Sequence, residues 1–116
     1  MSFHCNQRYA ALLKPRAAKE LVTALKQELH VPLHLHTHDS TGNGVSTVLM
    51  AAEAGVDIVD LAIESMSSMT SQPSMNAVVE ALRGSKRDTG LDFEELDELA
   101  VTTDASVKFT SSLRVI

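Results

Sequence analysis

Residues 32–39, PLHLHTHD, decide how the rest of the chain is interpreted, because three imidazoles alternate there with apolar or β-branched side chains. This alternation predicts a β-strand, whose successive side chains point to opposite faces. His34, His36 and His38 then share one face of the strand, and the residues between them share the other. A pair of histidines two residues apart can bind one metal ion, so the histidine face is a candidate metal site.

The predicted strand lies between a helix and a turn. The turn STGNG at residues 40–44 places His38 and Asp39 at the carboxyl end of the strand, where α/β folds carry their active sites. Before the strand, Pro15 and apolar residues spaced three and four apart predict a helix. Its apolar stripe consists of Ala18, Leu21, Val22, Leu25 and Leu29.

The same helix and strand pattern repeats after the turn. A second helical stripe, which Gly55 ends as a left-handed cap, consists of Val45, Val48, Leu49 and Ala52. Val56–Ile63 then predicts a second apolar strand. The apolar content of Val31–Thr37 suggests burial on both faces, as in a parallel sheet. Alternating helices and strands predict an α/β fold built from βα units.

The remaining segments are less regular. Glu64–Pro73 reads as a polar loop, Ser85–Gly90 as a charged link, and no firm element is predicted in Met1–Ala10, expected to be loose, or in Val101–Ile116. Ser74 can cap a helix that Gly84 closes, and Asp92 with Glu95 forms a capping box for a last helix. The apolar residues of these two helices are Met75, Val78, Val79 and Leu82, then Phe93, Leu96 and Leu99.

Composition excludes several classes of function. The 116 residues suffice for one small domain, and a net charge of -5 argues against a nucleic-acid surface. No apolar run approaches the roughly 20 residues that span a bilayer, so no membrane contact is predicted. The single cysteine, Cys5, suits a reducing compartment and is interpreted as an unreactive thiol. Without a leader pattern, the predicted location is cytoplasmic, or the mitochondrial matrix for a truncated eukaryotic chain.

Several polar side chains near the strand ends have more than one interpretation. Asp39 either orients a metal-binding histidine or forms the turn after the strand. Asp57 and Asp60 bracket the second strand and are interpreted as cap or mouth residues rather than catalytic acids. His34 lies deeper on the histidine face and is expected to make an interior hydrogen bond. The methionines interpreted as packing residues are Met66, Met69 and Met75.

Four long motifs carry a resemblance to a known family: LHLHTHD at 33–39, STGNG at 40–44, AGVDIVD at 54–60 and SMSSMTSQPS at 65–74. Together they make residues 12–100 resemble the carboxyltransferase domain of pyruvate carboxylase. The α subunit of oxaloacetate decarboxylase and transcarboxylases contain the same type of domain, and the α subunit is the alternative assignment. The sequences LRG at 82–84 and DTGL at 88–91 favour pyruvate carboxylase. Residues 1–11 and 101–116 do not match.

The resemblance implies an incomplete (β/α)8 TIM barrel, namely its last two strands with the flanking helices. A complete barrel takes about 250 residues. Members of the family transfer a carboxyl group from carboxybiotin to pyruvate, which gives oxaloacetate. Biotin and pyruvate are therefore the implied cofactor and substrate, and family members are homo-oligomers.

The resemblance also implies a divalent metal, zinc or manganese, held by two histidines, an aspartate and a carbamylated lysine. The match places His36 and His38 at the two histidine positions. A metal there is a Lewis acid that polarises the pyruvate carbonyl. Two neutral imidazoles bring no charge, so carboxylate ligands are needed beside them. Thr70, Ser71 and Gln72 lie in a loop at the expected barrel mouth, where a contact with substrate or biotin can form.

The sequence departs from the family at identifiable positions. Gln7 stands where the family has the lysine that is carbamylated, and Ser68 stands where a glycine is usual. Residues 1–11 and 101–116 are interpreted as sequence from outside the family, joined to an interior that resembles the family. Two hypotheses follow: the chain is a fragment that regains carboxyl transfer with the rest of its domain, or it is a truncated and inactive remnant. For the chain alone, inactivity is expected.

Overall fold

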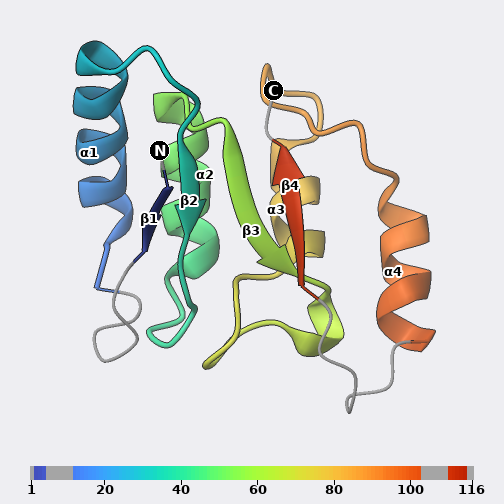
Figure 1. Cartoon of the computed structure of the whole chain (residues 1–116). Coiled ribbons are helices and arrows are strands. Elements are labelled where there is room, and N and C mark those ends of the chain that lie inside the picture. The colour runs from blue at the N-terminus through green and yellow to red at the C-terminus, as the bar shows by residue number, and fades with distance from the viewer. Residues whose placement is uncertain (1, 5–11, 103–109, 115–116) are drawn as a thin grey trace.

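The computed structural model describes residues 2–4, 12–102 and 110–114, and in these ranges it contains an α/β fold (Figure 1). In chain order the elements are β1 (Ser2–His4), α1 (Pro15–Glu28), β2 (His34–His36), α2 (Gly44–Ala54), β3 (Ile58–Ala62), the 3-10 turn η2 (Glu64–Met66), α3 (Met75–Leu82), α4 (Phe93–Thr102) and β4 (Thr110–Arg114). Among these helices none is both long and apolar enough to cross a bilayer.

The strands form one mixed sheet in the order β1-β2-β3-β4. β2 and β3 are parallel, with His34 opposite Ile58 and Leu35 opposite Val59, as expected for two strands joined by a helix. β1 is also parallel to β2, whereas β4 runs antiparallel to β3. The two predicted strands are therefore the central ones, and the antiparallel β4 is foreign to an all-parallel barrel.

The outer strands come from the two segments in which the sequence predicts no firm element. The expectation that the first ten residues are loose is wrong for Ser2–His4, and β4 lies within the unassigned Val101–Ile116. Neither segment shows the regular alternation that marks a half-buried strand. Both pair with the edges of β2 and β3 through backbone N–H and C=O groups, which requires no particular side chains.

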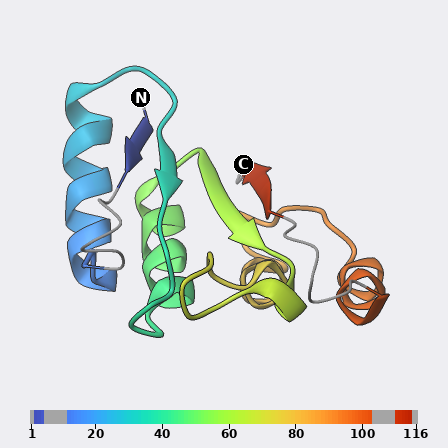
Figure 2. The ribbon, with the colours of Figure 1, turned by 60° about the horizontal axis from the view of Figure 1, so that its bottom comes forward.

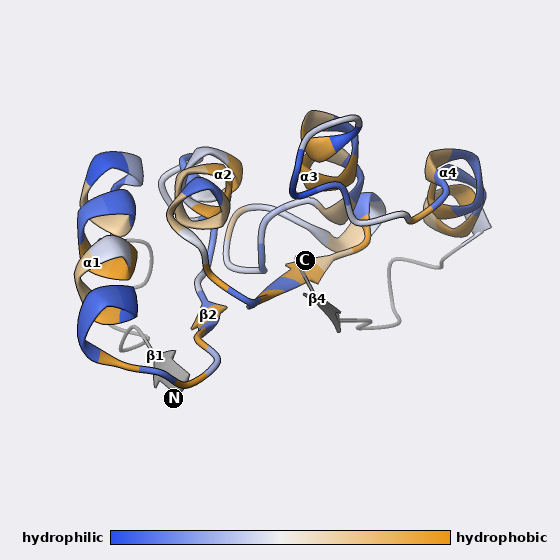
Figure 3. Cartoon of the chain, turned by 90° about the horizontal axis from the view of Figure 1, so that it is seen from above, coloured by the Kyte–Doolittle hydropathy of each residue, from blue (hydrophilic) through white to orange (hydrophobic). Residues whose placement is uncertain are grey.

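The four helices lie on one side of the sheet (Figure 3), and α1 packs beside α2 (Figure 2). In and around β2, Leu33, Leu35 and Thr37 are buried under this layer, while the three histidines between and after them are only half-buried. The prediction that this strand is buried on both faces is wrong, because in the described ranges helices cover one face only. We call the two sides the covered face and the open face.

The core lies between the covered face and the helices and contains almost no aromatic side chain. Its residues are Ala18, Val22, Leu33, Leu35, Val48, Ala51, Ala52, Val56, Val59, Leu61, Ile63, Met75, Val78, Val79, Leu82 and Leu96. Two predicted core positions fail: Leu21 of α1 is 39 % exposed and Leu99 of α4 is 51 % exposed. Both lie at the edges of their helical stripes, away from the buried positions of the same helix.

The helix ends follow the signals in the sequence. Pro15 begins α1, and Gly55 ends α2 with a φ of 102°, in the left-handed region that glycine adopts without steric cost. The Ser74 hydroxyl accepts the Ala77 N–H at 3.2 Å and so caps α3 as predicted. At α4 the Asp92 carboxylate accepts the N–H groups of Glu94 and Glu95, which is the Asp half of the predicted capping box.

Candidate metal centre

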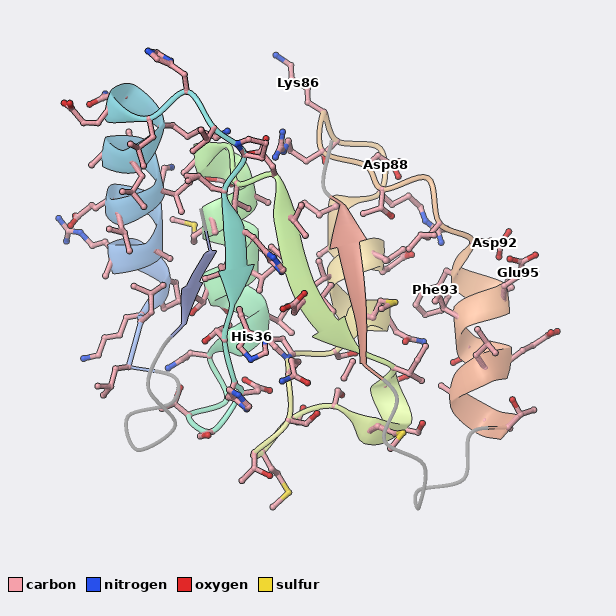
Figure 4. The ribbon with its side chains drawn as sticks, viewed as in Figure 1. His36, Lys86, Asp88, Asp92, Phe93 and Glu95 are labelled. Carbon is pink, nitrogen blue, oxygen red and sulfur yellow. The ribbon has the colours of Figure 1, made fainter. Side chains whose placement is uncertain are left out.

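The three histidines of the opening motif lie together at the open face. His34 and His36 are the first and last residues of β2, and His38 follows two residues later, where the strand turns into the loop before α2. Figure 4 shows His36 on β2 beside β3. The side chains of His34 and His36 are 32 % and 25 % exposed, so solvent reaches them without surrounding them.

The His36 and His38 rings approach each other through their Nε2 atoms, which are 3.4 Å apart. The ring centroids are 5.2 Å apart and the planes are inclined by 75°. Two bonds of about 2.0–2.1 Å at a tetrahedral angle place their nitrogen atoms about 3.4 Å apart. The spacing therefore fits two ligands of a single zinc-like cation.

The other nitrogen of each ring has a partner that fixes where its proton sits. His38 Nδ1 lies 2.6 Å from the Thr70 carbonyl oxygen, which only accepts hydrogen bonds, so Nδ1 carries the proton and donates it. His36 Nδ1 lies 2.7 Å from Oδ2 of Asp60, and the ionised carboxylate likewise accepts. In the neutral rings both Nε2 atoms then present lone pairs to each other. Lone pairs at this distance repel unless a proton or a cation lies between them.

Asp60 joins two of the histidines, which sequence reasoning missed. Its Oδ1 lies 2.7 Å from His34 Nε2, and its Oδ2 accepts from His36. The interpretation of Asp60 as a cap or mouth residue is wrong, because it lies inside β3, two residues after Ile58 and on the same face. The contact follows from the register of the two strands: with His34 opposite Ile58, period-two alternation puts Asp60 beside His36. His34 makes the hydrogen bond that was expected of it.

The other aspartate of this segment serves the fold. Asp57 Oδ2 accepts from Lys26 Nζ at 2.5 Å and from the Leu33 N–H at 2.7 Å, so it ties α1 to β2. Burial raises the pKa of Asp57, but these two hydrogen bonds and the charges of Lys26 and Arg87 outweigh burial and hold the pKa below its ordinary value.

Asp39 shapes the turn, which settles the alternative that the sequence left open. Its buried Oδ1 accepts the Gly44 N–H at 2.7 Å at the start of α2. A Cβ on Gly44 would lie 2.6 Å from this oxygen and 2.6 Å from Cγ of Pro73, so only glycine fits. The Asp39 N–H donates to the Ser71 carbonyl at 2.9 Å, and the turn therefore packs against the loop after β3.

The loop after β3 meets the histidines through its backbone. The Thr70 carbonyl holds His38 and the Ser71 carbonyl holds the Asp39 N–H, as expected for a loop at the same sheet end. Ser68 and Met69 have φ angles of 70° and 52°, a region that non-glycine residues rarely adopt. Met69 is 78 % exposed, so its interpretation as a packing residue is wrong. Met75, by contrast, is buried as predicted.

The described residues bring two imidazoles together but hold no complete set of metal ligands. Within residues 2–4, 12–102 and 110–114, no group of three or more His, Cys, Asp or Glu side chains is arranged to hold a metal ion. The His36 and His38 pair nevertheless fits a cation in spacing and in tautomer. The sequence interpretations of Cys5 and Gln7 fall outside the described residues.

A cleft of about 430 Å³ lies elsewhere, between the end of α3 and the start of α4. Its lining residues are Val79, Arg83, Asp88, Gly90, Leu91, Asp92, Phe93 and Glu94. The Arg83 guanidinium in it already pairs with Glu80 at 2.8 Å and lies 5.8 Å from the centre of the Phe93 ring. No histidine lines this cleft, so the convergent imidazoles are the stronger candidate for chemistry.

Comparison with known proteins agrees with the sequence resemblance. The chain is 51 % identical over 90 residues to pyruvate carboxylase 1 of Caenorhabditis elegans, and 50 % identical over 91 residues to pyruvate carboxylase of Staphylococcus aureus. These stretches are 77 % and 78 % of this chain, but the chain spans only 8 % of the length of each relative.

Solved structures that resemble this chain also come from pyruvate carboxylase. The carboxyl transferase domain from Rhizobium etli pyruvate carboxylase is similar with a TM-score of 0.76 and 50 % identity, over 78 % of this chain and 15 % of that one. A structure of that domain with pyruvate matches equally well. The sequence model of the HMGL-like family matches residues 10–102, which is most of the chain. This protein therefore belongs to the HMGL-like family.

Proposed function

We propose that this chain carries the two-histidine part of the metal site of a carboxyltransferase, whose complete domain transfers a carboxyl group from carboxybiotin to pyruvate and so makes oxaloacetate. The observation that carries the proposal is the 3.4 Å approach of His36 Nε2 and His38 Nε2, with both Nδ1 protons fixed by other partners. The similarity to pyruvate carboxylases and to a carboxyl transferase domain solved with pyruvate supports the choice of substrate.

In this proposal each part of the chain has a stated task. His36 and His38 are the metal ligands, and Asp60 and the Thr70 carbonyl hold their rings. The cation, zinc or manganese, supplies Lewis-acid chemistry at the pyruvate carbonyl. Two neutral ligands bind a divalent cation weakly. The anionic ligands, the biotin and the rest of a barrel of about 250 residues must come from outside the described residues.

Metal titration of the full 116-residue chain tests the ligand assignment. We expect Zn²⁺ binding that His36→Ala and His38→Ala each abolish, followed by isothermal titration calorimetry. His30→Ala is the matched control, because His30 is exposed and outside the cluster. Equal binding by His36→Ala and the wild-type chain would refute the ligand assignment.

Carboxyl exchange tests the activity. The chain joined to upstream carboxyltransferase sequence that contains the reactive lysine should exchange a carboxyl group between biotin and oxaloacetate when metal is present. The chain alone should show no exchange, in line with the expectation of inactivity. A joined protein that folds and binds metal but exchanges no carboxyl group would favour a non-catalytic remnant.

A further inference from the structure

We propose that Asp60 is a positioning residue: its carboxylate clamps His34 and His36 at once, which keeps the proton of His36 on Nδ1 and directs Nε2 toward His38. The inference deepens the proposed function and rests on it, because it explains how one ligand of the pair is prepared for a cation. It assigns a role to a residue of β3 and to a histidine outside the ligand pair.

The clamp is well defined in space. Asp60 Oδ1 lies 2.7 Å from His34 Nε2, and Asp60 Oδ2 lies 2.7 Å from His36 Nδ1. The Asp60 side chain is 18 % exposed, so water competes for it only in part. Parallel pairing of β2 and β3, with His34 opposite Ile58, fixes the distance between the backbones that carry these groups. The rings therefore meet a carboxylate whose position the sheet sets.

The chemistry of the clamp requires a carboxylate. An ionised aspartate accepts on both oxygens, so both imidazoles can donate to it. Asparagine has the same shape but accepts on one side and donates on the other, so one of the two rings would have to give up its proton there. An alanine holds neither ring. The proton of a neutral imidazole then distributes between Nδ1 and Nε2, and a protonated Nε2 cannot bind a metal.

His38 provides an internal reference. Its Nδ1 proton is held by the Thr70 carbonyl, which belongs to the loop after β3 and does not touch Asp60 in the contacts described above. Loss of the Asp60 carboxylate should therefore release His36 and leave His38 in its tautomer. A merely structural effect of the substitution would disturb both rings together.

The experiment measures ¹⁵N chemical shifts of the histidine rings in the full chain, without metal and at one pH, beside Zn²⁺ affinity by calorimetry. In the wild-type chain we expect His36 and His38 to carry their protons on Nδ1. In Asp60→Ala, His36 should lose this preference, His38 should keep it, and Zn²⁺ should bind about 10–100-fold more weakly. Asp60→Asn retains the shape and should change the tautomer of either His34 or His36.

Asp57→Asn is the matched control, because it removes a carboxylate three residues away that contacts Lys26 and the Leu33 N–H rather than an imidazole. It should leave the tautomers and the Zn²⁺ affinity unchanged. An unchanged His36 tautomer in Asp60→Ala, or in that variant a Zn²⁺ affinity within twofold of wild type, would overturn the inference. If the wild-type chain binds no Zn²⁺, the ligand assignment of the proposed function fails, and the tautomer measurement alone decides whether Asp60 positions His36.

Discussion

The covered and open faces of the sheet use the same two strands for different ends. On the covered face, Leu35 and Val59 are buried against the helices. On the open face, His36 and Asp60 are hydrogen-bonded to each other and remain half-buried. Period-two alternation thus separates the residues that make the fold from those that can make a site, and neighbouring positions in the sequence should respond very differently to substitution.

Substitution of Leu35 on the covered face should lower the free energy of unfolding more than any other change considered below. A small loss would contradict the difference between the two faces. Leu35→Ala leaves a cavity at a side chain that is 1 % exposed, and should lower the free energy of unfolding by about 2–5 kcal/mol. His36→Ala removes a half-buried, hydrogen-bonded ring and should lower it by about 1 kcal/mol. Urea denaturation followed by far-ultraviolet circular dichroism measures both. Similar losses for the two variants would mean that the faces do not differ in their contribution to stability.

The covered face could be predicted from the sequence, because residues that are buried on one face recur with the period of their helix or strand. The stripe of α3 predicted which of its side chains are buried, and the alternation around His34 predicted that Leu33, Leu35 and Thr37 share one face. The glycine and serine caps predicted where α2 ends and α3 begins. The strands β1 and β4 could not be predicted, because they join the sheet through backbone pairing at its edges. A segment that joins a sheet only by pairing with the backbone of an edge strand needs no particular pattern of side chains, so its sequence does not reveal it.

The open face was readable only in part. The alternation predicted that three histidines share one face, and the family resemblance implied His36 and His38 as the pair. The role of Asp60 depends on the register between β2 and β3, which no single segment contains. Asp57 and Asp60 look alike in the sequence, three residues apart at the ends of an apolar run. The first faces Lys26 and the Leu33 N–H, and the second faces two imidazoles, so tertiary placement alone separates a structural carboxylate from a candidate functional one.

The pH dependence of stability gives a further test of the comparison, because it measures the contribution of Asp57, a carboxylate that ties α1 to β2. The pKa of Asp57 in the folded chain lies below its ordinary value of 3.8, mainly because hydrogen bonds from Lys26 and the Leu33 N–H outweigh burial. The stabilisation by Asp57 is therefore fully present well above pH 3.8 and is lost as the pH falls below 3.8 through the folded-state pKa.

Asp57→Asn should lower the free energy of unfolding by about 1 kcal/mol at neutral pH, and the difference from wild type should shrink in acid. Urea denaturation across a pH series measures it. Glu53→Gln is the matched control, because Glu53 also pairs with a lysine of α1, Lys19, but this pair is largely exposed and should contribute at most a few tenths of a kcal/mol. A difference between Asp57→Asn and wild type that grows in acid would contradict the direction of the pKa shift.

The smallest expected effect concerns the loop that presents the Thr70 carbonyl to the open face. Ser68 adopts a φ of 70° because its N–H donates to the Gln72 carbonyl and its own carbonyl accepts the Ser71 N–H, each at 2.9 Å. This geometry gives a physical reason for the glycine that the family resemblance implies at this position. Ser68→Gly relieves roughly 1 kcal/mol of left-handed strain but frees the unfolded chain, so stability should rise by about 0.5 kcal/mol.

Ser67 provides the matched comparison because it is the same residue type one position earlier, with an ordinary φ of -89°. Ser67→Gly relieves no strain, loses the hydroxyl bond to the Glu64 carbonyl, and should lower the free energy of unfolding by about 0.5–1 kcal/mol. The two substitutions therefore change stability in opposite directions, which thermal unfolding of both variants can resolve. Equal destabilisation would show that the turn tolerates serine at Ser68 without strain. The position of the Thr70 carbonyl beside His38 would then depend on the hydrogen bonds of this loop and not on a strained backbone at Ser68.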